Sequence, residues 1–508
     1  MRAGLNAGIG SRRNLGGGSA PAAITATGLT FRWNPNFSTL TTATDGGGRT
    51  VVTQINDMVA GAHLATTTAA ESPVLMVDKQ GRRFLRFNDK AWMAFTTAAA
   101  MDYKAVCLYF VGRMHRPPPG GSATQNILYL NGYVTFAHMN VATSDTTPFL
   151  RMVNGNTSNT AGRQKLVAGS QLQVLCTRST TTIAVRVNEN QIAVTGAATA
   201  GTQGTPGGLV GAASTTPAAA TIGGFDMYEI AGYTGIISDA DVTSNCNSYQ
   251  SYFNIGNISR SITLEGDSRT FGWVSPGTAG SYGNGSLIPS GDCLAVQLAM
   301  NSADNNVRIV SNAATGNAIS DLVTQRDLPN SLASNTGGFV TGWQNDWHYL
   351  IGTNDQAQLP AAGSPVWTTT ESTVARANEA MDRANGMIAL LNTVPGSVGY
   401  LQRGLRVYCS TEIARTTATD MVAIDQFRSR VTAGAFLTAC DANVGGTYDG
   451  KLIINPLDAW TVSGSTIFST LANAGNFTYY APDSLHLSAA GTYQYALSIR
   501  GALGLTPA

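Results

Sequence analysis

Short runs of alternating apolar and polar residues dominate the first half of the chain. Between residues 27 and 255 these runs are separated by turns rich in Gly, Asn, Asp and Thr, and each run has the length of one β-strand. The clearest are "LTFRW", "RRFLRFN", "AVCLYFVGRM", "LQVLCTR" and "TIAVRVNENQIAV". Because no long helical pattern interrupts them, the sequence predicts an all-β sandwich or jelly roll.

The pattern changes near residue 259, where short apolar strands begin to alternate with helical stretches. The strands are "SITLE", "NVRIVS", "WHYLIG", "LRVYCS" and "KLIINP", and the helical stretches cover residues 371–393 and 418–434. In the first stretch the apolar residues recur at helical spacing: Val374, Ala377, Met381, Ala384, Ile388 and Leu391. The alternation predicts a parallel sheet with helices on both faces, in which ligands bind beyond the carboxyl ends of the strands.

These changes of pattern divide the chain into three parts. Residues 1–26 are rich in Gly, Ala and Ser and are predicted to form a flexible arm unless a partner orders it. Residues 27–256 form the predicted sandwich, and residues 257–508 form the predicted α/β domain. Within the sandwich, residues 195–224 are compositionally simple, which predicts a long surface loop.

Composition and charge exclude several classes of function. The chain has 508 residues, of which 43% are apolar and only 12% charged, about half the usual share of charged residues. Its net charge of +1 gives no field that attracts nucleic acid or anionic membrane. No apolar run has the length of a membrane span, so we expect neither nucleic-acid binding nor membrane insertion.

The cysteines and the start of the chain carry two further expectations. The six cysteines lie far apart without a C-x-x-C pair or a nearby histidine, so we expect buried free thiols and no metal site: Cys107, Cys176, Cys246, Cys293, Cys409 and Cys440. The first residues contain no continuous apolar stretch of signal-peptide length. We therefore expect any activity outside a cell to depend on another route of release.

Residues that could take part in catalysis follow the ends of the predicted strands in the second half of the chain. Ser268 follows the apolar run Ile262, Thr263 and Leu264. A serine hydroxyl is a weak nucleophile at neutral pH and needs a base, which in turn needs a partner that fixes its tautomer. Asp483 and His486, three residues apart in "DSLHLSAAG", supply both groups. Ser268, Asp483 and His486 are therefore the candidate catalytic residues.

A serine nucleophile also requires hydrogen-bond donors for the negative oxygen of the tetrahedral intermediate. Suitable groups are the backbone N–H groups of Ser268 and Gly316 and the side-chain amide of Asn354, each close to a strand end. Gly316 has no Cβ and so lets the backbone approach a substrate closely. These three residues are the candidate oxyanion hole.

The blocks "GDSRTFG", Gly316, "GTND" and "DSLHLSAAG", in this order, resemble the four sequence blocks of the SGNH or GDSL-type esterases and lipases. The resemblance covers roughly the C-terminal half. It implies a flavodoxin-like three-layer α/β/α sandwich with a parallel sheet and no cofactor. It also implies that Ser268 is the nucleophile, that Asp483 and His486 complete the triad, and that Gly316 and Asn354 complete the oxyanion hole. Arg269 departs from the family, which usually has an aliphatic residue after the nucleophile.

The N-terminal half resembles a concanavalin A or laminin-G type jelly roll. "TRSTTTIAVRVNENQIAV" is similar to the strand–turn–strand of such domains, and "FDMYEIAGYTGIISDADVTSNCNSYQSYFNI" to their closing strand and helix. A lectin-like sandwich joined to an SGNH domain behind a Gly-rich arm resembles a bacteriophage tail fibre, tailspike or other virion surface protein. This resemblance implies a location on the virion, with the arm bound to other virion proteins. Phage fibres and spikes are commonly trimers, but no heptad or β-helix repeat supports one here.

The sequence therefore predicts a serine esterase that removes O-acetyl groups from bacterial surface polysaccharide. Two alternatives stay open at this point. The first is a non-catalytic virion adhesin or decoration protein that uses the same fold to bind its host, and the second is an extracellular bacterial esterase with a carbohydrate-binding domain.

Each candidate residue also has a structural interpretation. Ser268 has the residue type that caps a helix, and Asp483 could cap the helix that begins near Ser488. Arg269 is expected either to select an anionic glycan or to point into water. His348 is expected to be packed against its strand. A structural role is also expected for His63, His115 and His138, and a place in the core rather than a sugar site for Trp33, Trp92 and Phe95.

Overall fold

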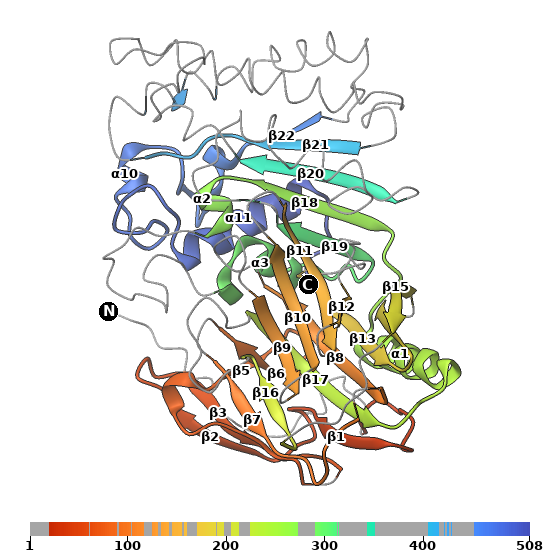
Figure 1. Cartoon of the computed structure of the whole chain (residues 1–508). Coiled ribbons are helices and arrows are strands. Elements are labelled where there is room, and N and C mark those ends of the chain that lie inside the picture. The colour runs from red at the N-terminus through yellow and green to blue at the C-terminus, as the bar shows by residue number, and fades with distance from the viewer. Residues whose placement is uncertain are drawn as a thin grey trace, which may run out of the picture.

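Two β-sheets of different construction dominate the described part of the protein, a large antiparallel one and a smaller parallel one (Figure 1). A third sheet has only two strands, β23 (Thr461–Val462) and β24 (Ser465–Thr466). The computed structural model describes residues 20–59, 61–88, 91–102, 104–115, 124–130, 134–141, 145–154, 157–159, 170–188, 190–197, 205–212, 224–272, 290–311, 313, 343–350, 405–415, 421, 424–425, 428 and 452–508. The predicted helix at 371–393, most of the helix at 418–434, Gly316, Asn354 and Cys440 lie outside these residues.

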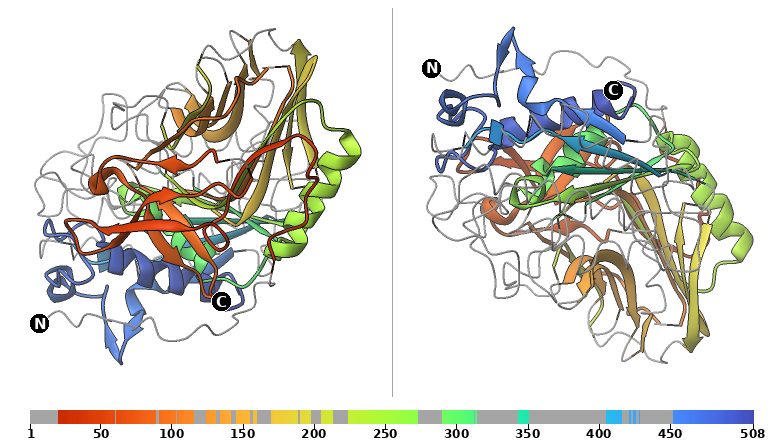
Figure 2. Two further views of the ribbon diagram at one scale, coloured as in Figure 1. Left: turned by 90° about the horizontal axis from the view of Figure 1, so that it is seen from below. Right: turned by 90° about the horizontal axis from the view of Figure 1, so that it is seen from above.

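The antiparallel sheet contains 17 strands and curls on itself (Figure 2). Its strands are β1 (Leu29–Trp33), β2 (Leu40–Thr44), β3 (Thr50–Ile55), β4 (Leu64–Ala65), β5 (Val74–Val77), β6 (Arg83–Phe87), β7 (Met93–Phe95), β8 (Val106–Met114), β9 (Thr124–Leu130), β10 (Val134–Val141), β11 (Asp145–Asn154), β12 (Thr157–Asn159), β13 (Gln173–Ser179), β14 (Thr182–Val187), β15 (Asn190–Ala197), β16 (Gly208–Val210) and β17 (Phe225–Thr234). All five runs quoted from the first half of the sequence form strands here.

The central strand β8 shows why this sheet is buried on both faces. Val106, Leu108 and Phe110 point into the core enclosed by the curled sheet, whereas Cys107 and Tyr109 point into a second core on the other face. Successive side chains of a strand point to opposite faces. The unbroken apolar character of "AVCLYFVGRM" is therefore explained by burial of both faces.

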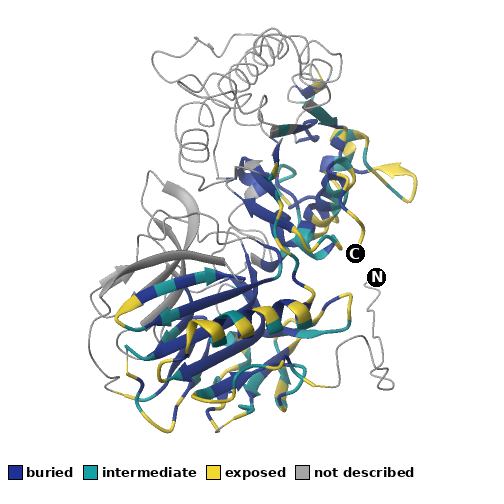
Figure 3. Ribbon diagram, turned by 90° about the vertical axis from the view of Figure 1, so that its right-hand side faces the viewer, coloured by how far each residue is buried: buried dark blue, intermediate teal, exposed yellow. Residues whose placement is uncertain are grey.

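Helix α1 (Asp239–Phe253) covers the second core, and Figure 3 shows that its outer side is exposed. The helix begins after Ser238, whose side chain accepts a hydrogen bond from the backbone N–H of Asp241. It follows β17, as the resemblance of this segment to a closing strand and helix implied. Residues 20–26, within the predicted arm, lie against α1, where the Thr25 N–H donates to Asn245.

The parallel sheet has five strands in the order β19 (Val307–Ser311), β18 (Arg260–Gly266), β20 (Gln344–Leu350), β21 (Leu405–Ser410) and β22 (Leu452–Asn455). All four pairings are parallel, as the sequence predicted. Helices α3 (Leu294–Met300) and α11 (Ala489–Ala502) pack on the face that is turned toward the antiparallel sheet (Figure 1).

Two hydrogen bonds to the backbone of Ile309 connect the parallel sheet, at its edge, with the segment before β13. Strand β19 is the outermost described strand on its side. The Ser170 N–H donates to the Ile309 carbonyl at 2.9 Å, and the Ile309 N–H donates to Oε1 of Gln171 at 3.2 Å. The segment before β13 thus satisfies backbone groups that an open sheet edge would expose.

The protein is therefore mostly β, with the antiparallel sheet before the parallel one, as predicted.

The prediction of one long loop over residues 195–224 is wrong at β16, whose three residues are buried between β7 and β9. Its Gly, Leu and Val pack into the sheet because the low side-chain volume of Gly208 fits against the backbone of Tyr129 and Leu130. Five cysteines are buried, as expected: Cys107, Cys176, Cys246, Cys293 and Cys409. Among the described helices, none has both the length and the apolar character needed to cross a lipid bilayer.

We predict that Gly232→Ala destabilises the antiparallel part. A Cβ on Gly232 of β17 would lie 2.1 Å from the Phe31 ring, which is fully buried, so the ring has to move. Such overpacking costs about 1–3 kcal/mol. The free energy of unfolding from urea titration measures the effect. Gly46→Ala, where the added Cβ meets no atom within 4 Å, is the control, and equal stabilities of the two variants would contradict the prediction.

Candidate active site

A sharp turn between β18 and the short helix α2 (Ser268–Phe271) presents Ser268 at the carboxyl end of the parallel sheet. Gly266 makes the turn possible, because its φ is +154° and a Cβ there would lie 2.4 Å from Oγ1 of Thr270. The helix cap is Asp267, whose side chain accepts from the Arg269 N–H. Ser268 is thus the first residue of the helix, not its cap, and its hydroxyl is free for another partner.

That partner is His486, whose Nε2 lies 2.9 Å from Oγ of Ser268 across 218 residues of sequence. The other ring nitrogen, Nδ1, lies 2.6 Å from Oδ2 of Asp483. Both Ser268 and His486 are 8% exposed. The structure therefore brings all three candidate catalytic residues into one hydrogen-bonded chain.

The loop before α11 holds this geometry by its own backbone hydrogen bonds. Oδ1 of Asp483 accepts from the N–H groups of Leu485 and His486, both at 3.0 Å. The Ala481 N–H donates to the His486 carbonyl, which closes the loop. Helix α11 is capped by Ser488, so Asp483 does not serve that purpose.

Asp483 remains a carboxylate over the whole neutral range. Burial raises its pKa, but the hydrogen bonds from the His486 side chain and from the two backbone N–H groups outweigh this effect and lower the pKa to about 2. An ionised Asp483 can only accept, so it requires the proton of the neutral imidazole to be on Nδ1. Nε2 is then a hydrogen-bond acceptor for the Ser268 hydroxyl.

Gly316 and Asn354 lie outside the described residues, so the structure describes only Ser268 of the predicted oxyanion hole. The structure does describe the two strands that precede Gly316 and Asn354 in the sequence. Gly316 follows β19 and Asn354 follows β20, and these are the two direct neighbours of β18. In a parallel sheet the carboxyl ends of neighbouring strands meet at one edge, and ligands bind where the strand order reverses. Ser268 lies at that point of the sheet.

Arg269 is buried with two carboxylates, which neither expectation from the sequence anticipated. It is 1% exposed, its Nη2 lies 3.0 Å from Oδ2 of Asp267, and its Nη1 is paired with Oε1 of Glu412. It therefore neither points into water nor faces a glycan. Glu412 is a residue that the sequence analysis missed, because only the strand order brings the end of β21 near the end of β18.

The remaining histidines and aromatic residues of the described parts behave largely as expected. His348 is fully buried, with Nε2 2.8 Å from Oγ of Ser410, and burial lowers its pKa to about 3. His115 is buried beside Asp226 at 3.0 Å. Three aromatic residues are buried as expected: Trp33, Trp92 and Phe95. His63 is exposed and accepts from the Asp57 N–H, while nothing is described of the His138 side chain.

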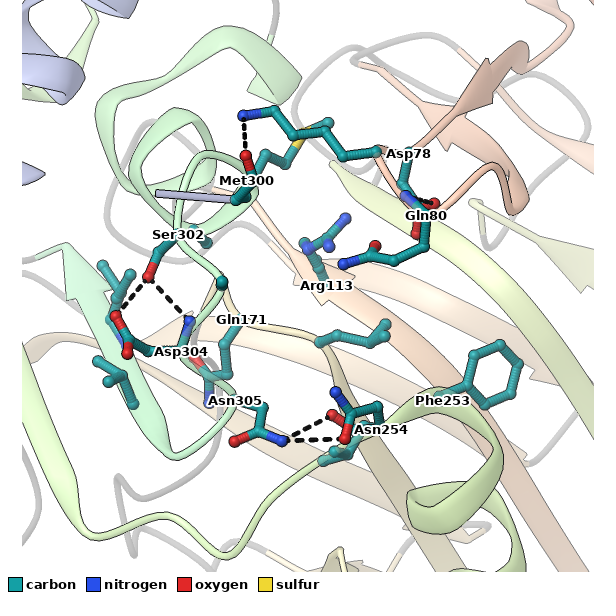
Figure 4. Close-up of a pocket in the computed structure, with 18 of the residues that line it drawn as sticks. Asp78, Gln80, Arg113, Gln171, Phe253, Asn254, Met300, Ser302, Asp304 and Asn305 are labelled. Atoms are coloured by element: carbon teal, nitrogen blue, oxygen red, sulfur yellow. Dashed lines mark hydrogen bonds between the residues drawn. The ribbon is translucent and has the colours of Figure 1, made fainter. Parts of the chain in front are cut away.

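A cavity of about 100 Å³ lies between the two sheets, away from Ser268 (Figure 4). Polar side chains from both parts line it, among them Gln80, Arg113 and Asp304, and Figure 4 shows the Ser302 hydroxyl hydrogen-bonded to Asp304. None of Ser268, Asp483 and His486 is among the residues that line it.

Within the described ranges there is no cluster of three or more His, Cys, Asp or Glu residues that could hold a metal ion. Nδ1 of His486 faces Oδ2 of Asp483, and Nε2 of His486 faces Oγ of Ser268. The arrangement is chemically suited to move a proton from a hydroxyl to an imidazole.

No family model matches the chain. No curated protein matches it either. Solved structures that match include a Bacillus subtilis protein at 12% identity, with 85% of this chain and 87% of that chain covered and a TM-score of 0.31.

Two further solved structures match about half of the chain. A GDSL-like lipase from Parabacteroides merdae is 14% identical, with 49% of this chain and 98% of that chain covered and a TM-score of 0.30. A catalytic mutant of an acetylxylan esterase from Geobacillus stearothermophilus is 15% identical, with 49% and 96% covered and a TM-score of 0.29. TM-scores this low support no conclusion about this chain, so its function has to be inferred from the geometry of the site.

We predict that Asp483 stabilises the folded protein only while it is ionised. Its folded pKa of about 2 lies below the ordinary 3.8, so the contribution is complete above pH 4 and is lost as the pH falls through 2. The difference in free energy of unfolding between wild type and Asp483→Asn should therefore shrink from pH 5 to pH 2. Urea titrations at several pH values measure it, and a difference independent of pH would contradict the prediction.

Proposed function

We propose that the protein is a serine ester hydrolase with Ser268 as nucleophile, His486 as general base and Asp483 as the residue that orients the imidazole. The observation that carries the proposal is the continuous chain of hydrogen bonds from Asp483 through His486 to Ser268, at 2.6 and 2.9 Å. Separations in this range allow direct proton transfer. The half-buried, ionised Asp483 carboxylate on Nδ1 stabilises the imidazolium that forms when the serine is deprotonated.

In the first half-reaction, Oγ of Ser268 attacks the ester carbonyl carbon while its proton moves to Nε2 of His486. The carbonyl oxygen becomes an oxyanion in the tetrahedral intermediate. The C–O bond to the alcohol then breaks, Nε2 returns the proton to the leaving oxygen, and an acyl-enzyme on Ser268 remains.

In the second half-reaction, a water molecule replaces the alcohol. His486 takes a proton from the water as it attacks the acyl carbon, and the bond between that carbon and Oγ of Ser268 then breaks, which releases the carboxylic acid. Nε2 then returns the proton to Oγ of Ser268, so no proton is gained or lost by the enzyme.

For the oxyanion we propose the backbone N–H of Ser268, the backbone N–H of Gly316 and the side chain of Asn354. The N–H of a first helical residue has no partner inside its helix, which leaves the Ser268 amide available. The placement of Gly316 and Asn354 after the two strands that flank β18 supports their part in the proposal.

We further propose the finer assignments that the sequence suggests. The C-terminal part is an SGNH-type hydrolase of flavodoxin-like architecture, and the N-terminal part is a concanavalin A-like sandwich. The substrate class is O-acetylated bacterial surface polysaccharide, and the location is the surface of a phage virion, with residues 1–26 as the attachment to other virion proteins. The support for these assignments is the order of the four sequence blocks and the pairing of a sandwich with this site.

Hydrolysis of p-nitrophenyl acetate tests the proposed reaction. We expect Ser268→Ala and His486→Ala each to lower kcat by at least about 1,000-fold, because the members of a triad act as a unit. Ser251→Ala, at an exposed position of α1, is the control and should hydrolyse the ester like wild type. Equal rates for wild type and Ser268→Ala would contradict the proposal and favour a non-catalytic adhesin.

Release of acetate from purified O-acetylated capsule or lipopolysaccharide tests the substrate class. We expect acetate release by wild type and none by Ser268→Ala, with little activity on esters of long-chain acids. Activity on long-chain esters together with none on the acetylated polysaccharides would reject this substrate and leave the ester hydrolase proposal standing.

A further inference from the structure

Arg269 connects two segments of the chain that the hydrogen bonds of the proposed triad do not join. It follows Ser268 directly, while Glu412 comes just after β21. Strand β20 lies between β18 and β21, so the Arg269 side chain reaches across the end of β20 to meet Glu412. Asp267, Arg269 and Glu412 are all at most 1% exposed and form what we call the carboxyl-end cluster.

The cluster also holds the backbone on either side of the nucleophile. The Asp267 carboxylate accepts from the Arg269 N–H at 2.9 Å and from Arg269 Nη2 at 3.0 Å. Burial lowers the pKa of Arg269, but the two carboxylates outweigh this effect and raise it above its usual value, so the guanidinium is charged. A planar guanidinium holds two carboxylates in fixed directions because its donors form a rigid fork, whereas the three donors of an ammonium rotate.

The segment that carries His486 lies within electrostatic range of the cluster. Tyr480 is fully buried; burial raises the pKa of its hydroxyl, and the charges of Arg269, Arg428 and Glu412 act on it as well. Tyr480 also forms a β-bridge with Leu487, directly after His486. Arg428 donates from Nε to the backbone carbonyl of Glu412 at 2.7 Å, which holds the backbone of Glu412 in place.

We propose that Arg269 and Glu412 are a pair of positioning residues that hold the Ser268 turn at hydrogen-bond distance from His486. The proposal rests on the proposed ester hydrolysis for its kinetic test. Neither residue acts on the substrate. Because reacting groups that move by about 1 Å can lose roughly 100-fold in rate, a change in this pair should lower kcat with little change in KM.

The same sheet contains a matched control at its opposite end. Arg260, the first residue of β18, is paired with Asp346 of β20 at 2.5 Å, and Arg406 of β21 is paired with the same carboxylate at 2.6 Å. Asp346 is 1% exposed. Like the carboxyl-end cluster, this amino-end cluster links β18 with β21 through arginine and carboxylate side chains, but it lies at the end of β18 away from Ser268.

The experiment compares Arg269→Lys with Arg260→Lys in the full chain. Both keep the positive charge and lose the fork of the guanidinium. We expect both to lower Tm, but only Arg269→Lys to lower kcat for p-nitrophenyl acetate, by about 10- to 100-fold, with KM within about twofold of wild type. Glu412→Gln, which removes one charge and keeps the size of the side chain, should lower kcat in the same way.

A fall in Tm for Arg269→Lys with kcat unchanged would show that the pair only stabilises the fold and would overturn the proposal. An equal fall in kcat for Arg260→Lys would overturn it too, since the effect would then be general. Crystal structures of wild type and Arg269→Lys give a test without activity: we expect the distance from Ser268 Oγ to His486 Nε2 to exceed hydrogen-bond range in the variant alone. If wild type hydrolyses no ester, the proposed function fails, while this distance still decides the positioning role.

Discussion

Parallel pairing of β18 with both of its neighbours is the constraint on which the site depends. Because β19 and β20 run in the same direction as β18, their carboxyl ends lie at one edge, and the segments after them have to share that edge. The turn at Gly266 then presents Ser268 there, and the loop before α11 brings His486 to it from 218 residues away. A serine and a histidine so distant in sequence can meet at 2.9 Å only because the strand order is fixed.

The balance of charge around this edge is unusual for a chain with so few charged residues. Two carboxylates and one guanidinium are buried behind Ser268, and the Asp483 carboxylate lies on the far side of His486. Buried ion pairs contribute little net stability, because removing the charges from water costs about as much as their attraction returns. At this site the ion pairs act through their direction, because each charged hydrogen bond fixes the orientation of one segment relative to another.

Much of the fold and the core of the site could be predicted from the sequence. A strand-length apolar run identified β8, period-two alternation identified β14, and the change of pattern near residue 259 identified the parallel sheet. Ser268, Asp483 and His486 were found because each lies in a short block with recognisable chemistry. Glu412 could not be found, because "STEIA" contains no such block and its pairing depends on the order of β20 and β21. The burial of Arg269 was missed for the same reason, since an arginine without a visible partner is expected in water.

The contact between Ile309 and residues 170–171 bears on how this protein can be divided. A fragment that begins at β18 would leave the backbone of β19 without the partners that Ser170 and Gln171 supply. An uncovered strand edge is a template for pairing with another chain. The segment before β13 thus covers part of the edge of the parallel sheet, and a fragment that begins at β18 would need a replacement for that contact.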